Sequence, residues 1–261
     1  MFAFRKLRAA QYHCKQVDKL VDSQHEELRQ RHEEFTREAS WKKTDEGTSR
    51  VIRSRNEFSF ELCAFFAAIR SAIDFLTQAC AHHISGAQQA TSISTFFKLI
   101  KSGKKGPILE VVAKNEKWLL WIREYRDYLA HRVIVRTMAG NQIHWKAGMT
   151  TATSHPIVVP SETPRNVPDT RRARVAEEPE SFFTVATSES FAVDARGRRR
   201  LAEYTIEIEP TEGYIRIEEL MKREVAAFES FFIEIVNALK ELDFAPTPAD
   251  QDTRRKRSET A

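Results

Sequence analysis

Three side chains near the middle of the chain could together cleave a phosphodiester. Arg126 and Asp127 are adjacent, and His131 follows the arginine after four intervening residues. RNA can be cut without a metal when its 2′-hydroxyl attacks the neighbouring phosphate, which requires a group that moves the proton and a cation that stabilises the charged phosphorane. Histidine, with a pKa of about 6.5, suits the first role, and the permanently charged fork of arginine suits the second. Asp127 could orient either partner or cap a helix segment.

The spacing of these residues also limits how they can meet. In an unbroken helix, side chains five residues apart point in directions that differ by about 140°. A shared site for Arg126 and His131 therefore requires a helix break near Arg126–Asp127, or two motifs that meet across a dimer. The same spacing recurs in Arg8 and His13, within a segment that is typical of a plain amphipathic helix.

The stretch 121–132, Trp-Ile-Arg-Glu-Tyr-Arg-Asp-Tyr-Leu-Ala-His-Arg, resembles the R-x(4–6)-H motif of the HEPN superfamily, in which a polar residue follows the arginine. Residues 66–76 resemble the second helix of several HEPN-like bundles, and the resemblance covers residues 4–137 and 211–243. It differs at Val133, where many family nucleases carry tyrosine. The resemblance implies a metal-independent endoribonuclease of a toxin–antitoxin or antiviral defence system. It also implies a homodimer, with an antitoxin or regulatory protein as a possible partner.

Two other functions stay open on the sequence alone. One is a non-catalytic HEPN-like module that binds RNA or a protein, and the other is a structural helical scaffold. In either case Arg126, Asp127 and His131 would form a polar cluster or a solvated helix face. Arg70 and Asp74, one turn apart, are most simply interpreted as an intrahelical ion pair.

Net charge does not by itself indicate a nucleic-acid partner, because 41 basic residues stand against 37 acidic ones and the charges are interleaved. Basic clusters occur in segments that are typical of loops and tails, where they could contact phosphates or simply increase solubility. The candidate RNA-binding arginines are Arg70, Arg132, Arg171, Arg172, Arg198 and Arg199.

No sequence pattern indicates a metal or cofactor. The adjacent His82 and His83 would point about 100° apart on a helix, and the chain has no dinucleotide, P-loop or zinc-protease motif. Charged residues interrupt the apolar runs near the N-terminus, and the three cysteines are widely separated. We therefore expect a soluble cytoplasmic protein with reduced thiols, no cofactor and no membrane partner.

Hydrophobic periodicity predicts helices over 4–40, 54–84, 92–101, 108–137 and 211–242. Strands are predicted over 141–145, 181–193 and 200–209, with a hairpin turn at 194–197. Residues 149–179 are rich in proline, threonine and serine, which predicts a long loop.

These elements predict a mainly α fold, an up-and-down helical bundle of the HEPN type with a small antiparallel β-hairpin insertion. The bundle would comprise residues 1–137 and 211–245 as a single domain. Residues 138–210 would form the strand and loop insertion, and residues 246–261 a disordered tail.

Overall fold

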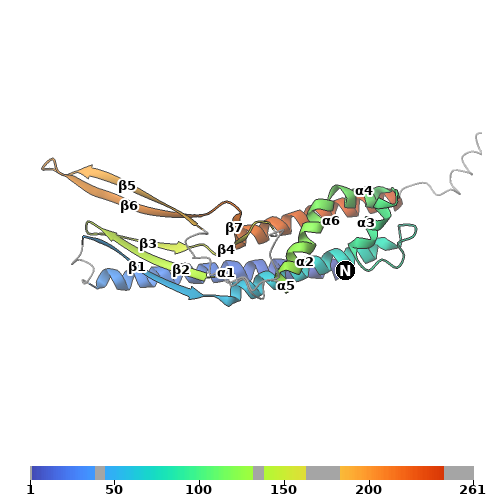
Figure 1. Ribbon diagram of the computed structural model, residues 1–261, viewed down its shortest axis with the longest axis horizontal. Coiled ribbons are helices and arrows are strands. Elements are labelled where there is room, and N and C mark those ends of the chain that lie inside the picture. The colour runs from blue at the N-terminus through green and yellow to red at the C-terminus, as the bar shows by residue number, and fades with distance from the viewer. Residues whose placement is uncertain (1, 39–44, 132–137, 163–182, 244–261) are drawn as a thin grey trace, which may run out of the picture.

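The computed structural model of the protein describes residues 2–38, 45–131, 138–162 and 183–243. These residues form an elongated molecule, with helices gathered at one end and strands at the other, and with α1 running along its length (Figure 1). The helices are α1 (Phe2–Arg37), α2 (Asn56–Ala81), α3 (Ile93–Lys101), α4 (Pro107–Lys114), α5 (Glu116–His131) and α6 (Ile217–Asp243).

The helices share one core of aliphatic and aromatic side chains. The apolar stripe of α2 is fully buried at Phe58, Phe65 and Phe66. The alanine residues beside this stripe let other helices approach α2 closely. Helix α6 packs against both α1 and α2. Burial of each large apolar side chain contributes about 1.5–3 kcal/mol, so this shared core is the main stabilising feature of the helical end.

The strands among the described residues belong to three small antiparallel sheets. They are β1 (Glu46–Ser54), β2 (Met138–Lys146), β3 (Met149–His155), β4 (Val158–Pro160), β5 (Phe183–Val193), β6 (Arg199–Pro210) and β7 (Tyr214–Arg216). The sheets have the orders β1-β2-β3, β4-β7 and β5-β6.

The three-stranded sheet covers the C-terminal half of α1. Gln24 of α1 is buried and donates to the Ser154 hydroxyl at 2.6 Å, and His32 contacts the Thr150 hydroxyl at 2.9 Å. Gly47 of β1 pairs with Trp145 of β2, and a Cβ atom at Gly47 would lie 2.1 Å from the indole ring. Glycine is therefore required for the tryptophan to lie across β1.

The fold class predicted from the sequence is wrong. The described chain is a mixed α/β structure, with six helices and seven strands, instead of an up-and-down helical bundle with one hairpin. The segment between the helices predicted over 4–40 and 54–84 forms β1, for which no strand was predicted, and the predicted loop at 149–179 contains β3 and β4. β1 and β4 pair with strands far along the chain, and β3 packs on α1. Neither kind of contact leaves a strong local periodicity.

Other boundaries also differ from the prediction. The single helix expected over 108–137 is two helices, α4 and α5, with Asn115 between them. The predicted hairpin is present as β5 and β6, with the turn at Asp194–Gly197. The predicted tail 246–261 and most of the predicted loop lie outside the described residues. None of the helices in the described part has an apolar stretch long enough to cross a membrane.

Candidate functional site

A polar pocket of about 450 Å³ lies where α5 crosses α2, beside the start of α3. Three elements supply its walls, and five of the lining residues carry a charge. The pocket is lined by Ala67, Arg70, Ser71 and Asp74 of α2, by Ser92 and Ser94 at the start of α3, and by Arg123, Arg126 and Asp127 of α5. We call this the arginine pocket.

Aromatic packing beneath the pocket sets the positions of α2 and α5. Phe66 of α2 stacks on Tyr125 with ring centroids 4.5 Å apart and meets the edge of Trp121 at 5.7 Å. Tyr125 is fully buried and its hydroxyl donates to the Pro160 carbonyl at 2.9 Å, so α5 is also tied to β4. These contacts of Tyr125 place Arg126, the next residue on the helix, at the rim of the pocket.

The α5 wall presents two guanidinium groups around one carboxylate. Arg126 Nη1 donates to Asp127 Oδ1 at 2.9 Å, and Arg123 Nε lies 3.9 Å from Asp127 Oδ2. The side chains of Arg126 and Asp127 are 41% and 46% exposed, so solvent and ligands can reach both. An exposed pair of this kind contributes little to stability, which leaves Arg126 available to exchange its partner for an anion.

The α2 wall is more enclosed. Arg70 Nε and Asp74 Oδ2 form the expected intrahelical pair at 3.3 Å. Arg70 Nη1 and Asp74 Oδ1 are also buried, and neither has a hydrogen-bond partner among the described residues. Burial raises the pKa of Asp74, while Arg70, the Ile93 backbone N–H and Arg126 act in the opposite direction. The pocket therefore contains a donor and an acceptor that a ligand could satisfy.

The balance of charge favours an anionic ligand. Three arginines against two aspartates give the lining a net charge of +1. The hydroxyls of Ser92 and Ser94 lie 2.7 Å apart at the N-terminal end of α3, where the helix dipole adds partial positive charge. Guanidinium groups, hydroxyls and a helix N-terminus are the groups that bind phosphate in proteins. The pocket can therefore hold a phosphate group of a nucleotide or nucleic acid.

The structure brings together some of the residues singled out in the sequence. Arg126 and Asp127 line the arginine pocket, and so does Arg70. His131 is the last residue of α5, and its side chain lies outside the described part. Helix α5 is continuous through Arg126–Asp127, so residues 126 and 131 occupy backbone positions about 140° apart around its axis. A helix break near Arg126–Asp127, one of the two arrangements that could unite them, is therefore absent.

The remaining candidate RNA-binding residues are dispersed. Arg198 and Arg199 lie at the far end of the β5–β6 hairpin, and Arg132, Arg171 and Arg172 lie outside the described residues. Arg8 and His13 have the same spacing near the N-terminus, and there the histidine makes a structural contact: His13 Nδ1 is 2.6 Å from the Glu61 carboxylate.

Sequence reasoning missed several residues of the pocket: Arg123, Ser71, Ser92 and Ser94. Arg123 could have been found, since it precedes Arg126 by three residues and so shares its helix face. The serines carry no such signal, because they belong to elements that meet α5 only in the tertiary structure.

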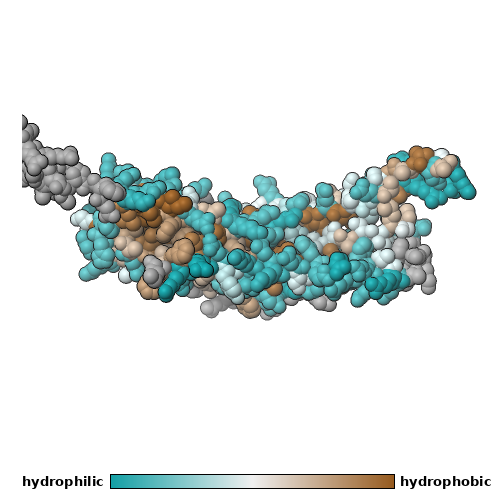
Figure 2. Space-filling model, turned by 180° about the vertical axis from the view of Figure 1, so that it is seen from behind, coloured by the Kyte–Doolittle hydropathy of each residue, from teal (hydrophilic) through white to brown (hydrophobic). Residues whose placement is uncertain are grey.

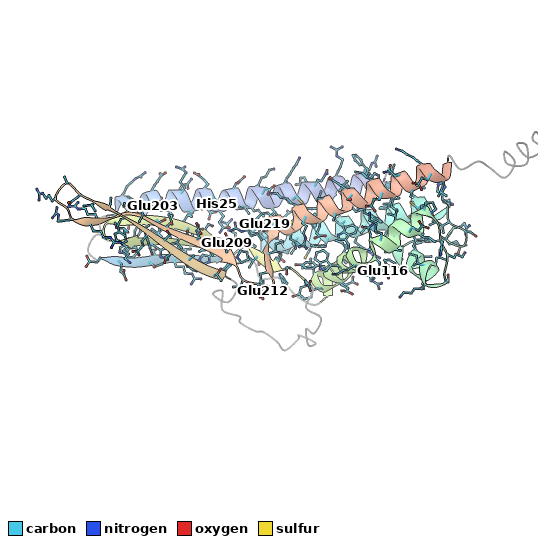
Figure 3. The ribbon with its side chains drawn as sticks, turned by 90° about the horizontal axis from the view of Figure 1, so that it is seen from above. His25, Glu116, Glu203, Glu209, Glu212 and Glu219 are labelled. Atoms are coloured by element: carbon cyan, nitrogen blue, oxygen red, sulfur yellow. The ribbon has the colours of Figure 1, made fainter. Side chains whose placement is uncertain are left out.

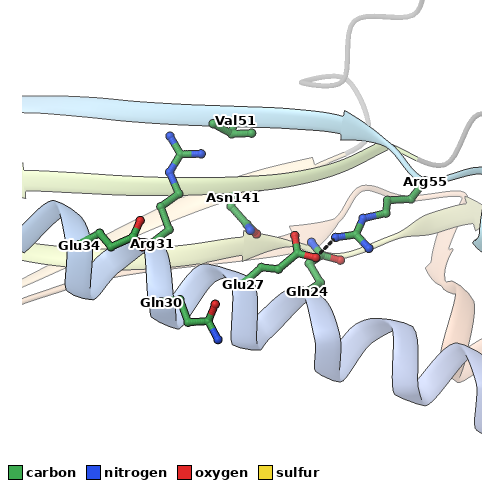
Figure 4. Close-up of a pocket in the computed structure, with 8 residues that line it drawn as sticks. All are labelled: Gln24, Glu27, Gln30, Arg31, Glu34, Val51, Arg55 and Asn141. Carbon is green, nitrogen blue, oxygen red and sulfur yellow. Dashed lines mark hydrogen bonds and ion pairs between the residues drawn. The ribbon is translucent and has the colours of Figure 1, made fainter.

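A second cavity, of about 350 Å³, lies between α1 and the three-stranded sheet (Figure 4). It is lined by Gln24, Glu27, Gln30, Arg31, Glu34, Val51, Arg55 and Asn141. Its two arginines are balanced by two glutamates, and Arg55 forms an ion pair with Glu27. This cavity therefore has no preference for an anion, and we regard the arginine pocket as the better candidate site.

No three histidine, cysteine, aspartate or glutamate side chains of the described residues are grouped so that they could hold a metal ion. Comparisons of the chain with protein-family models, with curated proteins and with solved structures found no match. The function of the protein is therefore inferred from the chemistry of the site.

Proposed function

We propose that the protein is a metal-independent endoribonuclease that holds the scissile phosphate in the arginine pocket. The observation that supports this proposal is the convergence of Arg126 with Arg70 and Arg123 in one solvent-reachable pocket. Fixed guanidinium groups stabilise the negative charge that develops on a phosphorane, and they do so most effectively when they are already in place. We expect the enzyme to act on RNA in the cytoplasm.

In the proposed reaction, neutral His131 removes the proton of the 2′-hydroxyl, whose oxygen attacks the adjacent phosphorus. The bond from phosphorus to the 5′-oxygen breaks, and that oxygen receives a proton from solvent water, while His131 returns the proton it took to the solvent. The products are a 2′,3′-cyclic phosphate and a 5′-hydroxyl. Arg126 neutralises the phosphate oxygens during the attack, and Asp127 holds Arg126 in position.

The continuous helix α5 supports a composite site shared by two subunits, because residues 126 and 131 are about 140° apart around one helix axis. In this proposal His131 of one copy approaches Arg126 of the other. A twofold homodimer places such motifs opposite each other in pairs, so each dimer would contain two equivalent sites.

Two experiments test the proposal: substitution of the site residues, and mixing of subunits that carry different substitutions. Arg126→Gln and His131→Ala should each reduce RNA cleavage about 10²–10⁴-fold while leaving the far-UV circular dichroism unchanged. His13→Ala is the matched control, since it removes the other histidine of the same spacing, and should retain activity. Activity should persist in EDTA, and the products should carry 2′,3′-cyclic phosphate.

Mixing then distinguishes a composite site from a site within one chain. Co-expressed Arg126→Gln and His131→Ala chains with different tags form heterodimers in which one of the two sites is intact. Activity should then return to about a quarter of the wild-type value, because half of the dimers are mixed and each has one working site. Purified heterodimers without activity would refute the composite site, and cleavage by the His131→Ala protein alone would refute the mechanism.

One observation favours a second function, a module that binds RNA without cutting it. Asp127 already partners both Arg123 and Arg126. In that case wild-type protein would bind RNA, Arg126→Gln would weaken binding, and no cyclic phosphate would form.

A further inference from the structure

The β5–β6 hairpin extends beyond the body of the molecule as a two-stranded ribbon (Figure 1). Its base is anchored, since Ile206 and Ile208 are buried and the Thr153 hydroxyl of β3 donates to the Ile206 carbonyl at 3.0 Å. Near the β2–β3 turn, Lys146 pairs with Glu189 at 2.7 Å. Residues 191–200, which we call the ribbon tip, lie beyond this last anchor.

The ribbon tip is strongly basic. It contains one acidic residue, Asp194, against the four arginines Arg196, Arg198, Arg199 and Arg200, which gives a net charge of +3. Asp194 accepts from the backbone N–H groups of Arg196 and Arg198 and thereby closes the turn. No acidic side chain of the described chain pairs with Arg196. Arg198 and Arg200 share the Asp194 carboxylate, each with its Nε 3.1 Å from Oδ2. The tip thus has one carboxylate against four guanidinium groups, and the remaining charge of +3 can attract an external anion.

The charge changes sign along the ribbon. Glu203, Glu207 and Glu209 follow the arginines along β6 and are exposed. Figure 3 shows Glu203 and Glu209 along the ribbon between its tip and the helical end. An anionic polymer is consequently attracted to the tip and repelled from the base, which confines the contact to the end of the ribbon.

An exposed aromatic ring accompanies the arginines. The Arg199 guanidinium lies 4.0 Å from the centroid of the Phe191 ring, and Phe191 is 44% exposed. Val193 beside it is 70% exposed. Figure 2 shows this mixture of hydrophobic and hydrophilic surface at the free end of the ribbon, at the upper right. Aromatic rings and guanidinium planes together are the surfaces on which unpaired bases stack in RNA-binding proteins.

We propose that the ribbon tip binds an unpaired segment of RNA, with a base stacked on Phe191 and Arg199 and with phosphates on Arg196 and Arg198. The proposal rests on the proposed function only for the choice of RNA as the nucleic acid. A second copy of the chain fits this surface less well, because two tips of charge +3 repel each other.

The tip and the arginine pocket are far apart. Phe75 of α2 stacks on Phe2 at the start of α1, so the pocket lies near that end, whereas Trp145 contacts Phe35 near the other end. Helix α1 alone, with 36 residues, is about 54 Å long. One RNA molecule that occupies both places must therefore be extended or carry a long stem, and the tip would select such substrates.

Binding experiments on the full-length protein test this proposal. A His131→Ala background prevents cleavage of the probe, and fluorescence anisotropy follows a labelled single-stranded RNA, a single-stranded DNA of the same sequence and a blunt RNA duplex. Phe191→Ala should weaken binding of both single strands roughly 5- to 150-fold, with little effect on the duplex. Phe191→Trp should retain the affinity, because it preserves the stacking surface.

The arginines are tested through salt dependence. The double variant Arg196→Gln/Arg198→Gln should reduce the slope of log K against log salt by about 1.4 for a single strand, corresponding to two phosphate contacts. The double variant Arg29→Gln/Arg37→Gln is the matched control, because it removes two exposed arginines from α1 at the same cost in net charge. Its slope should stay at the wild-type value.

The outcomes separate this inference from the proposed function. If tip variants bind the single strands as tightly as the control, or lose self-association instead, the ribbon tip is not an RNA site. If RNA is never cut but Phe191→Ala still loses the single strand, the proposed function fails and the tip site stands. If RNA is cut normally and every tip variant binds the single strands as the control does, the proposed function stands and the tip site fails.

Discussion

The contact between α2 and α5 that positions the arginine pocket can be tested with two phenylalanines of the same helix. Phe66 is fully buried, and its ring meets Phe65, Trp121 and Tyr125 at centroid distances of 5.2, 5.7 and 4.5 Å. Phe60, six residues earlier on α2, is 69% exposed. Replacing each by alanine makes the same chemical change in opposite environments.

Phe66→Ala should lower the free energy of unfolding by about 3–5 kcal/mol, through lost burial and the cavity that remains. For a chain of this size that corresponds to a fall in Tm of roughly 6–20 °C. Phe60→Ala should change the free energy by less than about 0.5 kcal/mol. Urea unfolding, followed by tryptophan fluorescence and far-UV circular dichroism, measures both.

Equal losses from the two substitutions would refute the reasoning, because they would show that α2 does not bury the face described here. A loss from Phe60→Ala that grows as the protein is diluted would have a different meaning. It would place Phe60 in the interface between two copies, which the proposed composite site requires somewhere on the surface.

Two further predictions concern buried thiols and a close contact. Burial raises the pKa of Cys14 to about 12 and that of Cys80 to about 11, so both should react with a disulfide reagent at pH 8 far more slowly than in the unfolded chain. In the unfolded chain the thiol pKa is about 8.5, so the free energy of unfolding should fall as pH rises above about 9. Rapid labelling of the folded protein would contradict the predicted protection of the thiols. Gly47→Ala should destabilise the protein by about 1–3 kcal/mol in urea unfolding, because the new Cβ would overlap the Trp145 ring. Glu46→Ala, at the exposed neighbouring position, should have almost no effect, and equal effects would disprove the clash.

The sequence by itself determined the features that depend on local periodicity. The stripe of Phe58, Phe65 and Phe66 identifies α2 because residues three and four apart share a helix face. The alternation of Tyr204, Ile206 and Ile208 identifies β6 for the corresponding reason in a strand. Arg126 and Asp127 stood out through their residue types alone, and the pocket that surrounds them could not be deduced from those types.

Only the tertiary structure decided which distant segments meet. β1 pairs with β2 across more than eighty residues of sequence, and β1 was missed because this pairing partner is non-local. The arginine pocket likewise depends on the place where α5 crosses α2, which is set by the packing of Phe66 on Tyr125. The continuity of α5 was decided in the same way: the sequence allowed a helix break near Arg126, and in the structure the helix runs through that point unbroken.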